Sequence, residues 1–185
     1  MLKALAHRYI TAKLERPFGY DAAYLHAMVD ADFASFCKFT VVTALVSRRA
    51  APAEALAAAG IVGTLAEDCG PCTQISVDLA LAGGARPEVI RAILAGDAAA
   101  MGEDGALGYR FARAALGKDL EAADAARDDV VRRWGQKGLI ALSLSLTSAR
   151  MYPTLKYAMG YGKACSKVTV AGEAAPFERP LPLAA

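Results

Sequence analysis

The amino-acid sequence predicts an all-α fold, a bundle of about seven or eight helices. Alanine is abundant almost throughout the chain, and it is the best helix former. Runs of β-branched residues are few, and apolar residues recur at helical spacing over most of the length. A chain of 185 residues is long enough for one domain with a sizeable core.

The first two expected helices occupy residues 1–16 and 22–47. Leucine, tyrosine and isoleucine follow helical spacing in the first of them, which is broken by Pro17 and Gly19. Asp21 is placed to cap the second helix. We expect the pattern to continue through residues 22–47 as one helix.

The middle of the chain predicts a pair of helices that flank a cysteine motif. Pro52 fits the first turn of a helix over residues 52–67. The next helix begins at the motif Cys69-Gly70-Pro71-Cys72 and stops at Gly83–Gly84, a typical carboxyl-terminal signal.

Helices over residues 87–97 and 103–117 follow. Residues 120–160 are expected to form two or three more, with possible breaks at Gly135, Gly138 and Pro153.

The chain divides into three parts on this pattern. Residues 1–48 form a helical extension, residues 49–165 form the main domain, and residues 166–185 form an extended carboxyl-terminal arm. The arm is rich in proline and lacks helical periodicity, so we expect it to be disordered or to lie on a neighbouring molecule.

Charge and hydropathy argue against two classes of partner. The net charge is +2, and no basic patch is interleaved with aromatic residues, so nucleic acid is not expected as a partner. The longest apolar stretch, residues 33–46, is broken by Lys38 and is too short to span a membrane. We read no signal peptide at the amino terminus and expect a cytoplasmic protein.

The cysteines are the most informative residues. The chain has four of them: Cys37, Cys69, Cys72 and Cys165. They do not suggest a framework of disulfides. The only histidines, His7 and His26, have no ligand spacing, so we expect neither structural zinc nor another metal or cofactor. Cys37 fits a small core residue and Cys165 an incidental thiol.

The spacing of Cys69 and Cys72 is suited to redox chemistry. Residues three apart share one face of a helix, and Pro71 is tolerated only in the first turn. The amino end of a helix favours a thiolate, above all at Cys69. The pair can therefore cycle between dithiol and disulfide, although two inert, buried cysteines remain an alternative.

The same four letters occur in thioredoxin, but the flanking sequence differs from that fold. An alanine-rich helical pattern precedes the motif where thioredoxin has a strand, and no strand bearing a proline follows at a suitable distance.

The sequence around the cysteine motif is similar to that of another group of proteins. Residues 50–162, with "EDCGPCTQISVDLALAGGARPEVIRAILAGD" and "GYRFARAAL", resemble the carboxymuconolactone decarboxylase / alkylhydroperoxidase D-like superfamily. The resemblance implies an alkylhydroperoxidase D-like helical subunit that forms a homo-oligomer (dimer, trimer or hexamer). It also implies thiol-dependent reduction of a small or alkyl hydroperoxide, or of a disulfide, with an external dithiol as reductant.

The resemblance implies that Cys72 attacks the peroxide and that Cys69 resolves the product as a disulfide, whereas helix position alone favours Cys69 as the nucleophile. The chain departs from the family's relay, because Ser76 and Ala57 stand where a histidine and a glutamate are common. Serine can hydrogen-bond a thiol but is no base near neutral pH.

Two carboxylates could replace the missing base. Glu67 lies beside the cysteines and Glu54 one turn before Ala57, and of the two Glu67 is better placed. Glu67 and Asp68 are equally compatible with acids at a helix end, where Asp68 would be the cap. The predicted site residues are Cys69, Cys72, Glu67 and Ser76.

A second function remains open beside the enzyme. The missing histidine and glutamate are compatible with a catalytically weak oligomeric module whose cysteine pair senses redox state. Decarboxylation is third, because members of the superfamily with that activity generally lack the dithiol.

Overall fold

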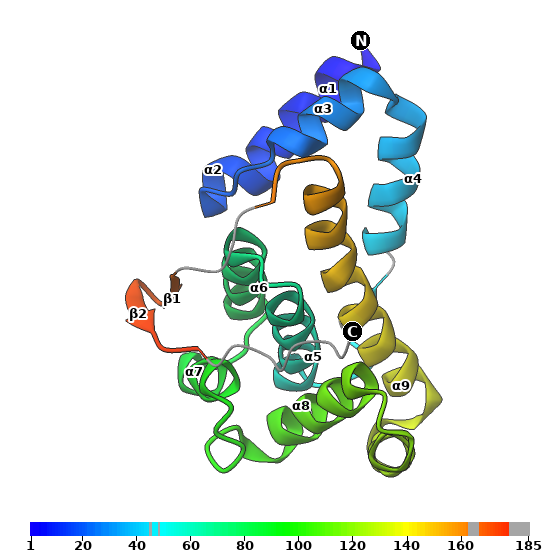
Figure 1. The fold of residues 1–185 in the computed structure, drawn as a ribbon, viewed down its shortest axis with the longest axis vertical. Helices are drawn as coiled ribbons and strands as arrows, with labels where there is room; N and C mark the ends of the chain where they lie inside the picture. Colours follow the sequence, from blue (N-terminus) through cyan, green and yellow to red (C-terminus); the bar gives the residue numbers. More distant parts are fainter. Residues whose placement is uncertain (45, 48, 163–166, 178–185) are drawn as a thin grey trace.

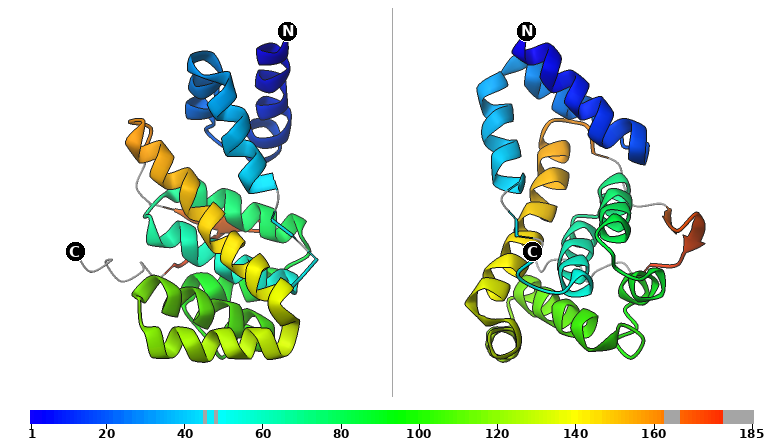
Figure 2. Two further views of the ribbon diagram at one scale, coloured as in Figure 1. Left: turned by 90° about the vertical axis from the view of Figure 1, so that its right-hand side faces the viewer. Right: turned by 180° about the vertical axis from the view of Figure 1, so that it is seen from behind.

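The amino-terminal extension is a bent helix followed by two shorter ones. The computed structural model describes residues 1–44, 46–47, 49–162 and 167–177. The extension consists of α1 (Leu2–Ile10), a π-helical turn η1 (Thr11–Glu15), α2 (Arg16–Phe18), α3 (Ala23–Ala31) and α4 (Phe33–Ala44). The first three run on without a gap and end at Gly19, whose φ of +58° is left-handed. Figures 1 and 2 show the extension at one end of the molecule.

The predicted single helix over residues 22–47 is wrong, because the chain breaks at Asp32. Its φ of −147° and ψ of 89° are not helical. The Asp32 carboxylate accepts a hydrogen bond from the backbone N–H of Ser35 at 3.1 Å, the contact of an N-cap residue at the start of a new helix. The break directs α4 away from α3 and down along the side of the molecule (Figure 1).

The main domain is built around one central helix. Its helices are α5 (Ala53–Ala66), α6 (Gly70–Ala82), α7 (Pro87–Ala95), α8 (Gly102–Gly117) and α9 (Leu120–Ala158). The helix α5 packs against all the others in this group and is apolar on every side, as a core helix must be. Small residues allow close contact: a Cβ at Gly108 of α8 would lie 2.5 Å from the carbonyl oxygen of Ala55.

The long element α9 contains one of the three predicted breaks. Gly135 has φ 68° and ψ −177°, so the helix changes direction there. The helix continues through both Gly138 and Pro153, where the sequence also allowed breaks. Its last turns, beyond Pro153, pass beside the start of α6 and below the extension (Figure 1).

Part of the predicted arm is a β-hairpin on the chain's own surface. Strands β1 (Val168–Val170) and β2 (Glu173–Ala175) pair antiparallel. The turn residues Ala171 and Gly172 both have positive φ, as a tight hairpin turn requires. Val168 and Val170 are buried in the core cluster that includes α7. The arm expected to be disordered or on a neighbour is thus folded over residues 168–175, while residues 163–166, with Cys165, and 178–185 lie outside the described part.

The predicted all-α class is confirmed. If α1, η1 and α2 are taken as one helix, the described residues form eight helices, and β1 and β2 are their only strands. The extension has its own apolar cluster, which includes Tyr20, Tyr24 and Leu25 and packs against Ile75 of α6 and Tyr152 of α9. It therefore covers the end of the main domain where α6 begins.

Candidate functional site

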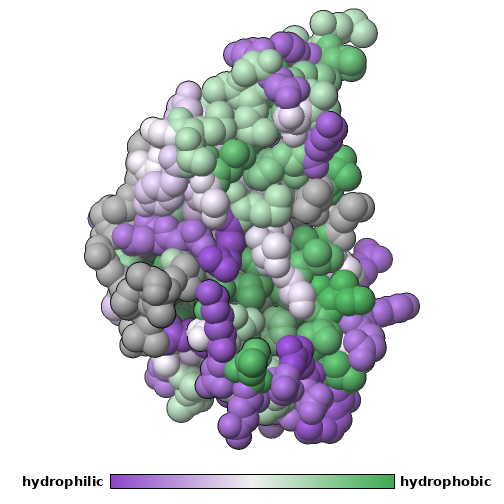
Figure 3. Space-filling view, turned by 45° about the vertical axis from the view of Figure 1, so that its right-hand side comes forward, coloured by the Kyte–Doolittle hydropathy of each residue, from purple (hydrophilic) through white to green (hydrophobic). Residues whose placement is uncertain are grey.

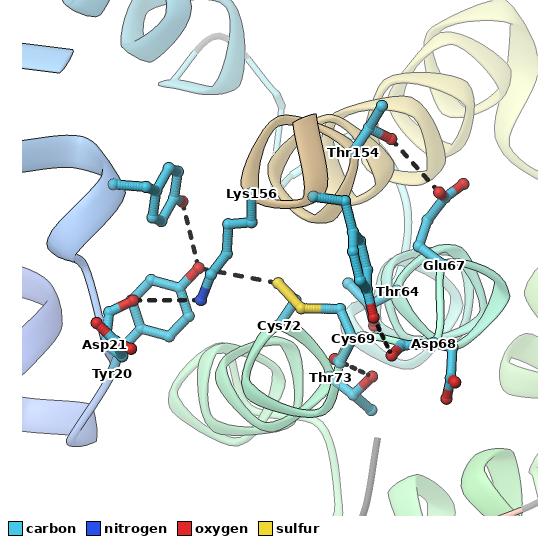
Figure 4. The surroundings of a disulfide bond; sticks show 12 residues. Tyr20, Asp21, Thr64, Glu67, Asp68, Cys69, Cys72, Thr73, Thr154 and Lys156 are labelled. Atoms are coloured by element: carbon cyan, nitrogen blue, oxygen red, sulfur yellow. Dashed lines mark hydrogen bonds between the residues drawn. A yellow bond between two sulfur atoms is a disulfide. The ribbon is translucent and has the colours of Figure 1, made fainter. Parts of the chain in front are cut away.

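The centre of the site is a disulfide at the start of α6. Cys69 is the N-cap residue of the helix, Pro71 stands in its first turn, and the two cysteine Cα atoms are 5.3 Å apart. The sulfur atoms are bonded to each other (Figure 4). The predicted pairing of Cys69 with Cys72 at the amino end of a helix is confirmed, and the cap is Cys69 itself, not Asp68.

The two sulfurs are buried, but they differ in their surroundings. Cys69 is 0% and Cys72 1% exposed. Cys72 forms part of the wall of a cavity of about 430 Å³, and Cys69 is not among the residues that line it. A small molecule in the cavity would therefore meet Cys72 first.

A tyrosine of the extension contacts the disulfide and a second tyrosine contacts the first; the sequence analysis identified neither. The hydroxyl of Tyr20 lies 3.9 Å from the Sγ atom of Cys72. Its other hydrogen-bond partner is the hydroxyl of Tyr24, at 3.2 Å. Burial raises the pKa of Tyr20 to about 12 and also raises that of Tyr24. Both phenols stay protonated at neutral pH, so Tyr20 can donate a hydrogen bond to sulfur.

A buried lysine lies against the same two tyrosines. Lys156, near the end of α9, is 0% exposed. Its Nζ atom lies 4.8 Å from the centre of the Tyr20 ring and 5.3 Å from that of Tyr24, within the range of cation–π attraction. It donates a hydrogen bond to the backbone carbonyl of Asp21 at 3.3 Å. Figure 4 shows the lysine pointing to the Tyr20 side of the disulfide.

Hydrogen bonds hold the loop that carries the disulfide. The hydroxyl of Tyr157 donates to the backbone carbonyl of Asp68 at 3.0 Å, and that of Thr73 donates to the carbonyl of Cys69 at 3.0 Å. Asp68 has a φ of +47°, an uncommon value for a residue with a side chain. The bond from α9 thus fixes a strained turn directly before the first cysteine.

The predicted residue Glu67 faces away from the sulfurs. The Nε atom of Arg150 donates to its carboxylate at 2.6 Å, and the hydroxyl of Thr154 donates at 3.4 Å. Figure 4 shows the carboxylate directed toward Thr154. The other carboxylate considered, that of Glu54, is paired with Arg86 at 2.6 Å. A catalytic role for Glu67 stays a prediction from the sequence.

Ser76 lines the same cavity as Cys72, whereas Gln74 and His26 point elsewhere. Ser76 lies one turn after Cys72 and lines the same cavity. Gln74 faces the hairpin: its amide donates to the carbonyl of Thr169 at 3.0 Å and accepts from the Thr169 N–H at 2.8 Å. His26 stays within the extension, where it contacts Glu15 at 3.0 Å and His7 at 2.6 Å.

In the described part of the chain, no group of three or more His, Cys, Asp and Glu side chains could hold a metal ion. Within the same residues, no helix combines the length and the apolar character needed to cross a membrane. The free cysteine Cys37, expected to be a small core residue, is half-buried and packs against the cluster of the extension.

Comparisons with protein-family models, curated proteins and solved structures found no match to this chain. The resemblance to the alkylhydroperoxidase D-like superfamily therefore stays a prediction from the sequence, and the function has to be argued from the site.

Proposed function

We propose that this protein is a thiol-dependent oxidoreductase that reduces a small or alkyl hydroperoxide, or a disulfide, through Cys69 and Cys72. The observation that carries the proposal is the position of Cys72. Its sulfur is bonded to Cys69 at the start of a helix, borders a cavity and contacts the hydroxyl of Tyr20. The family resemblance leads to the same reaction class.

In this proposal Cys72 is the attacking residue. Its side chain lines the cavity, which Cys69 does not. The sequence left two arguments in conflict, because helix position alone favours Cys69. Access to substrate favours Cys72, since a thiolate that cannot meet the peroxide cannot react with it.

The reaction begins with the reduced pair. The Cys72 thiolate attacks one oxygen of the hydroperoxide ROOH, the O–O bond breaks, and the alkoxide RO⁻ leaves and takes up a proton to give ROH. Cys72 is oxidised to a sulfenic acid. The Cys69 thiol then attacks the Cys72 sulfur, which forms the disulfide and releases water.

An external dithiol closes the cycle. One of its sulfurs attacks the protein disulfide, and the mixed disulfide is resolved by the other, which restores both cysteines and leaves the reductant oxidised. A disulfide substrate would be reduced by the same exchange without the sulfenic acid.

The tyrosine and the lysine take the place of the family's missing histidine and glutamate. Tyr20 donates a hydrogen bond to the Cys72 thiolate. The positive charge of Lys156 favours a thiolate over a thiol at this site. Neither residue acts as a base, so the pair helps by stabilising negative charge where it forms.

The burial of the sulfurs favours a second candidate, the catalytically weak module with a redox-sensing pair. Cys69 and Cys72 are almost inaccessible at the surface, and Glu67, the carboxylate expected to replace the missing base, is bound by Arg150. In that case the disulfide would form slowly and alter contacts to a partner.

We also propose that the subunit forms a homo-oligomer. Val41 of α4 and Ile140 and Leu144 of α9 are exposed although they are large and apolar. Figure 3 shows hydrophobic side chains gathered over this side of the molecule. Sedimentation of the wild type and of a Val41→Glu, Ile140→Glu double variant tests whether the assembly depends on this face.

The function is tested by thiol titration in a Cys37→Ser, Cys165→Ser background, in which Cys69 and Cys72 are the only thiols. One equivalent of hydroperoxide should consume both thiols rapidly. With Cys72→Ser added, the remaining thiol should oxidise only at the rate of an ordinary cysteine. Slow loss in both proteins would favour the sensing module over the enzyme.

A further inference from the structure

The cavity beside Cys72 is long and follows two neighbouring helices. Helix α5 contributes residues from Ala53 to Thr64, and α6 contributes residues from Cys72 to Gly83. Each set spans eleven steps along its helix, which corresponds to about 16 Å at a rise of 1.5 Å per residue. The extension and α9 supply the remaining walls. With a volume of about 430 Å³, the space suits a chain-shaped small molecule.

Several of the hydroxyl groups in the wall already donate to backbone carbonyls. Thr64 donates to the carbonyl of Ile61 at 3.0 Å, and Ser145 donates to that of Leu56 at 3.1 Å. Thr40 likewise donates to the carbonyl of Phe36 at 3.0 Å. Because these hydroxyl donors are already used, the side chains offer carbon surface to a ligand. Other parts of the wall are aliphatic: Ile10, Leu14, Leu25, Leu56, Ile75 and Leu79.

One cation stands in this otherwise uncharged lining. Lys13 of η1 is the only charged residue in the described part of the wall. It is exposed to solvent, and it forms no ion pair with any residue that the structure describes. An apolar cavity with one exposed cation is complementary to a molecule with a hydrocarbon chain and an anionic head.

We propose that the cavity binds a single-chain carboxylate of the fatty-acid class, with its carboxylate at Lys13 and its chain along α5 and α6. Binding does not depend on redox chemistry. A second statement rests on the proposed function: the hydroperoxide of such a fatty acid would be the preferred substrate. Cys72 would reduce it to the corresponding alcohol and water, and the external dithiol would be oxidised.

The test measures binding of dodecanoate to the oxidised protein by calorimetry, where no reaction can occur. Lys13→Ala should weaken binding about fivefold, the loss expected of one exposed ion pair. Lys38→Ala is the matched control, since Lys38 is an exposed lysine of the same extension outside the cavity, and it should change nothing. Methyl dodecanoate should bind wild type and Lys13→Ala alike.

A second variant fills the cavity. A Cβ at Gly60 would meet only the Oγ atom of Ser145, at 3.5 Å, so Gly60→Leu fits the helix and places its side chain in the space. Its far-UV spectrum and Tm should match the wild type, and binding of dodecanoate should be lost. The proposal is overturned if wild type does not bind at millimolar dodecanoate, or if Lys13→Ala or a folded Gly60→Leu binds as wild type does. Self-association abolished by Gly60→Leu, without binding by wild type, would instead show a second copy as the occupant.

The proposed preference for a fatty-acid hydroperoxide is tested separately. Rates with linoleic acid hydroperoxide and with hydrogen peroxide are compared in wild type and Lys13→Ala. The fatty-acid hydroperoxide should react faster in wild type, and Lys13→Ala should reduce that preference through KM. Binding without peroxide reduction would leave the fatty-acid site standing and refute only the proposed function.

Discussion

Replacement of Tyr20 by phenylalanine removes one oxygen atom from the site and leaves the ring in place. That oxygen contacts two groups, the Cys72 sulfur at 3.9 Å and the Tyr24 hydroxyl at 3.2 Å. The variant therefore has two separate consequences, one for the chemistry of the thiol and one for the stability of the fold.

The magnitude of the first consequence follows from the contact. A hydrogen bond to a charged acceptor contributes about 1.5–3 kcal/mol. The separation of 3.9 Å is long even for sulfur, so the lower value, about 1.5 kcal/mol, applies. At about 1.4 kcal/mol for each factor of ten, Tyr20→Phe should slow the oxidation of Cys72 about tenfold.

The second consequence is shared with a matched control. Tyr20→Phe and Tyr24→Phe each remove one partner of the same buried hydrogen bond, so each should lower the free energy of unfolding by about 1–2 kcal/mol. Tyr24→Phe keeps the hydroxyl that contacts Cys72. Only Tyr20→Phe should slow the thiol reaction.

The assay is stopped-flow oxidation of the reduced protein by hydroperoxide, with urea unfolding of the same three proteins. Equal oxidation rates for wild type and Tyr20→Phe would refute the role of the hydroxyl. An equal slowing by Tyr24→Phe would show that loosened packing, and not the contact with sulfur, controls the rate.

Three further changes test other parts of the structure. Lys156→Met removes a buried positive charge beside Tyr20, so the rate of Cys72 oxidation should reach half its plateau at a higher pH than in wild type; an unchanged pH profile would contradict the electrostatic role. Gln74→Ala removes the hydrogen bonds to Thr169, which should lower the free energy of unfolding by about 1–3 kcal/mol and speed hydrogen exchange in the hairpin. Unaltered exchange would mean that the buried Val168 and Val170 hold the hairpin without Gln74. Burial raises the pKa of Asp78 above its usual 3.8, so ionisation of this carboxyl opposes folding as the pH rises from about that value through the raised pKa. Asp78→Asn should therefore raise the free energy of unfolding at neutral pH and flatten its dependence on pH. A lower free energy of unfolding for the variant at pH 7 would contradict this sign.

Local sequence signals predicted the helices that carry the cysteines. Pro71 in the first turn and the glycines at residues 83–84 set the limits of α6, because proline and glycine restrict the backbone regardless of what surrounds them. Local signals of the same kind also mark a helix start and a hairpin turn that the sequence analysis did not predict. Asp32 and Ser35 have the spacing of a helix cap. Ala171–Gly172 follows a short run, Val168–Val170, that alternates between buried and half-buried residues, as a strand before a tight turn does.

The partners of the disulfide could not be predicted in this way. Tyr20 lies 52 residues before Cys72 in the sequence, and Lys156 approaches from the far end of α9. Such contacts depend on how the extension packs over the main domain, which no local pattern specifies. Glu67 shows the converse. Its closeness to Cys69 in the sequence suggested a contact with the sulfurs, but an ion pair with Arg150 directs the carboxylate away from them.

The central claim is that Cys72 attacks the peroxide from within the cavity. Its most direct test is to trap the sulfenic acid in Cys69→Ser, in which no disulfide can form between the two positions, with a 1,3-dione and to locate the adduct by mass spectrometry. One equivalent of hydroperoxide should place a single adduct on Cys72, and the matched Cys72→Ser protein should give little adduct on Cys69. An adduct on Cys69, or none on either residue within the time that oxidises an ordinary thiol, would contradict the account.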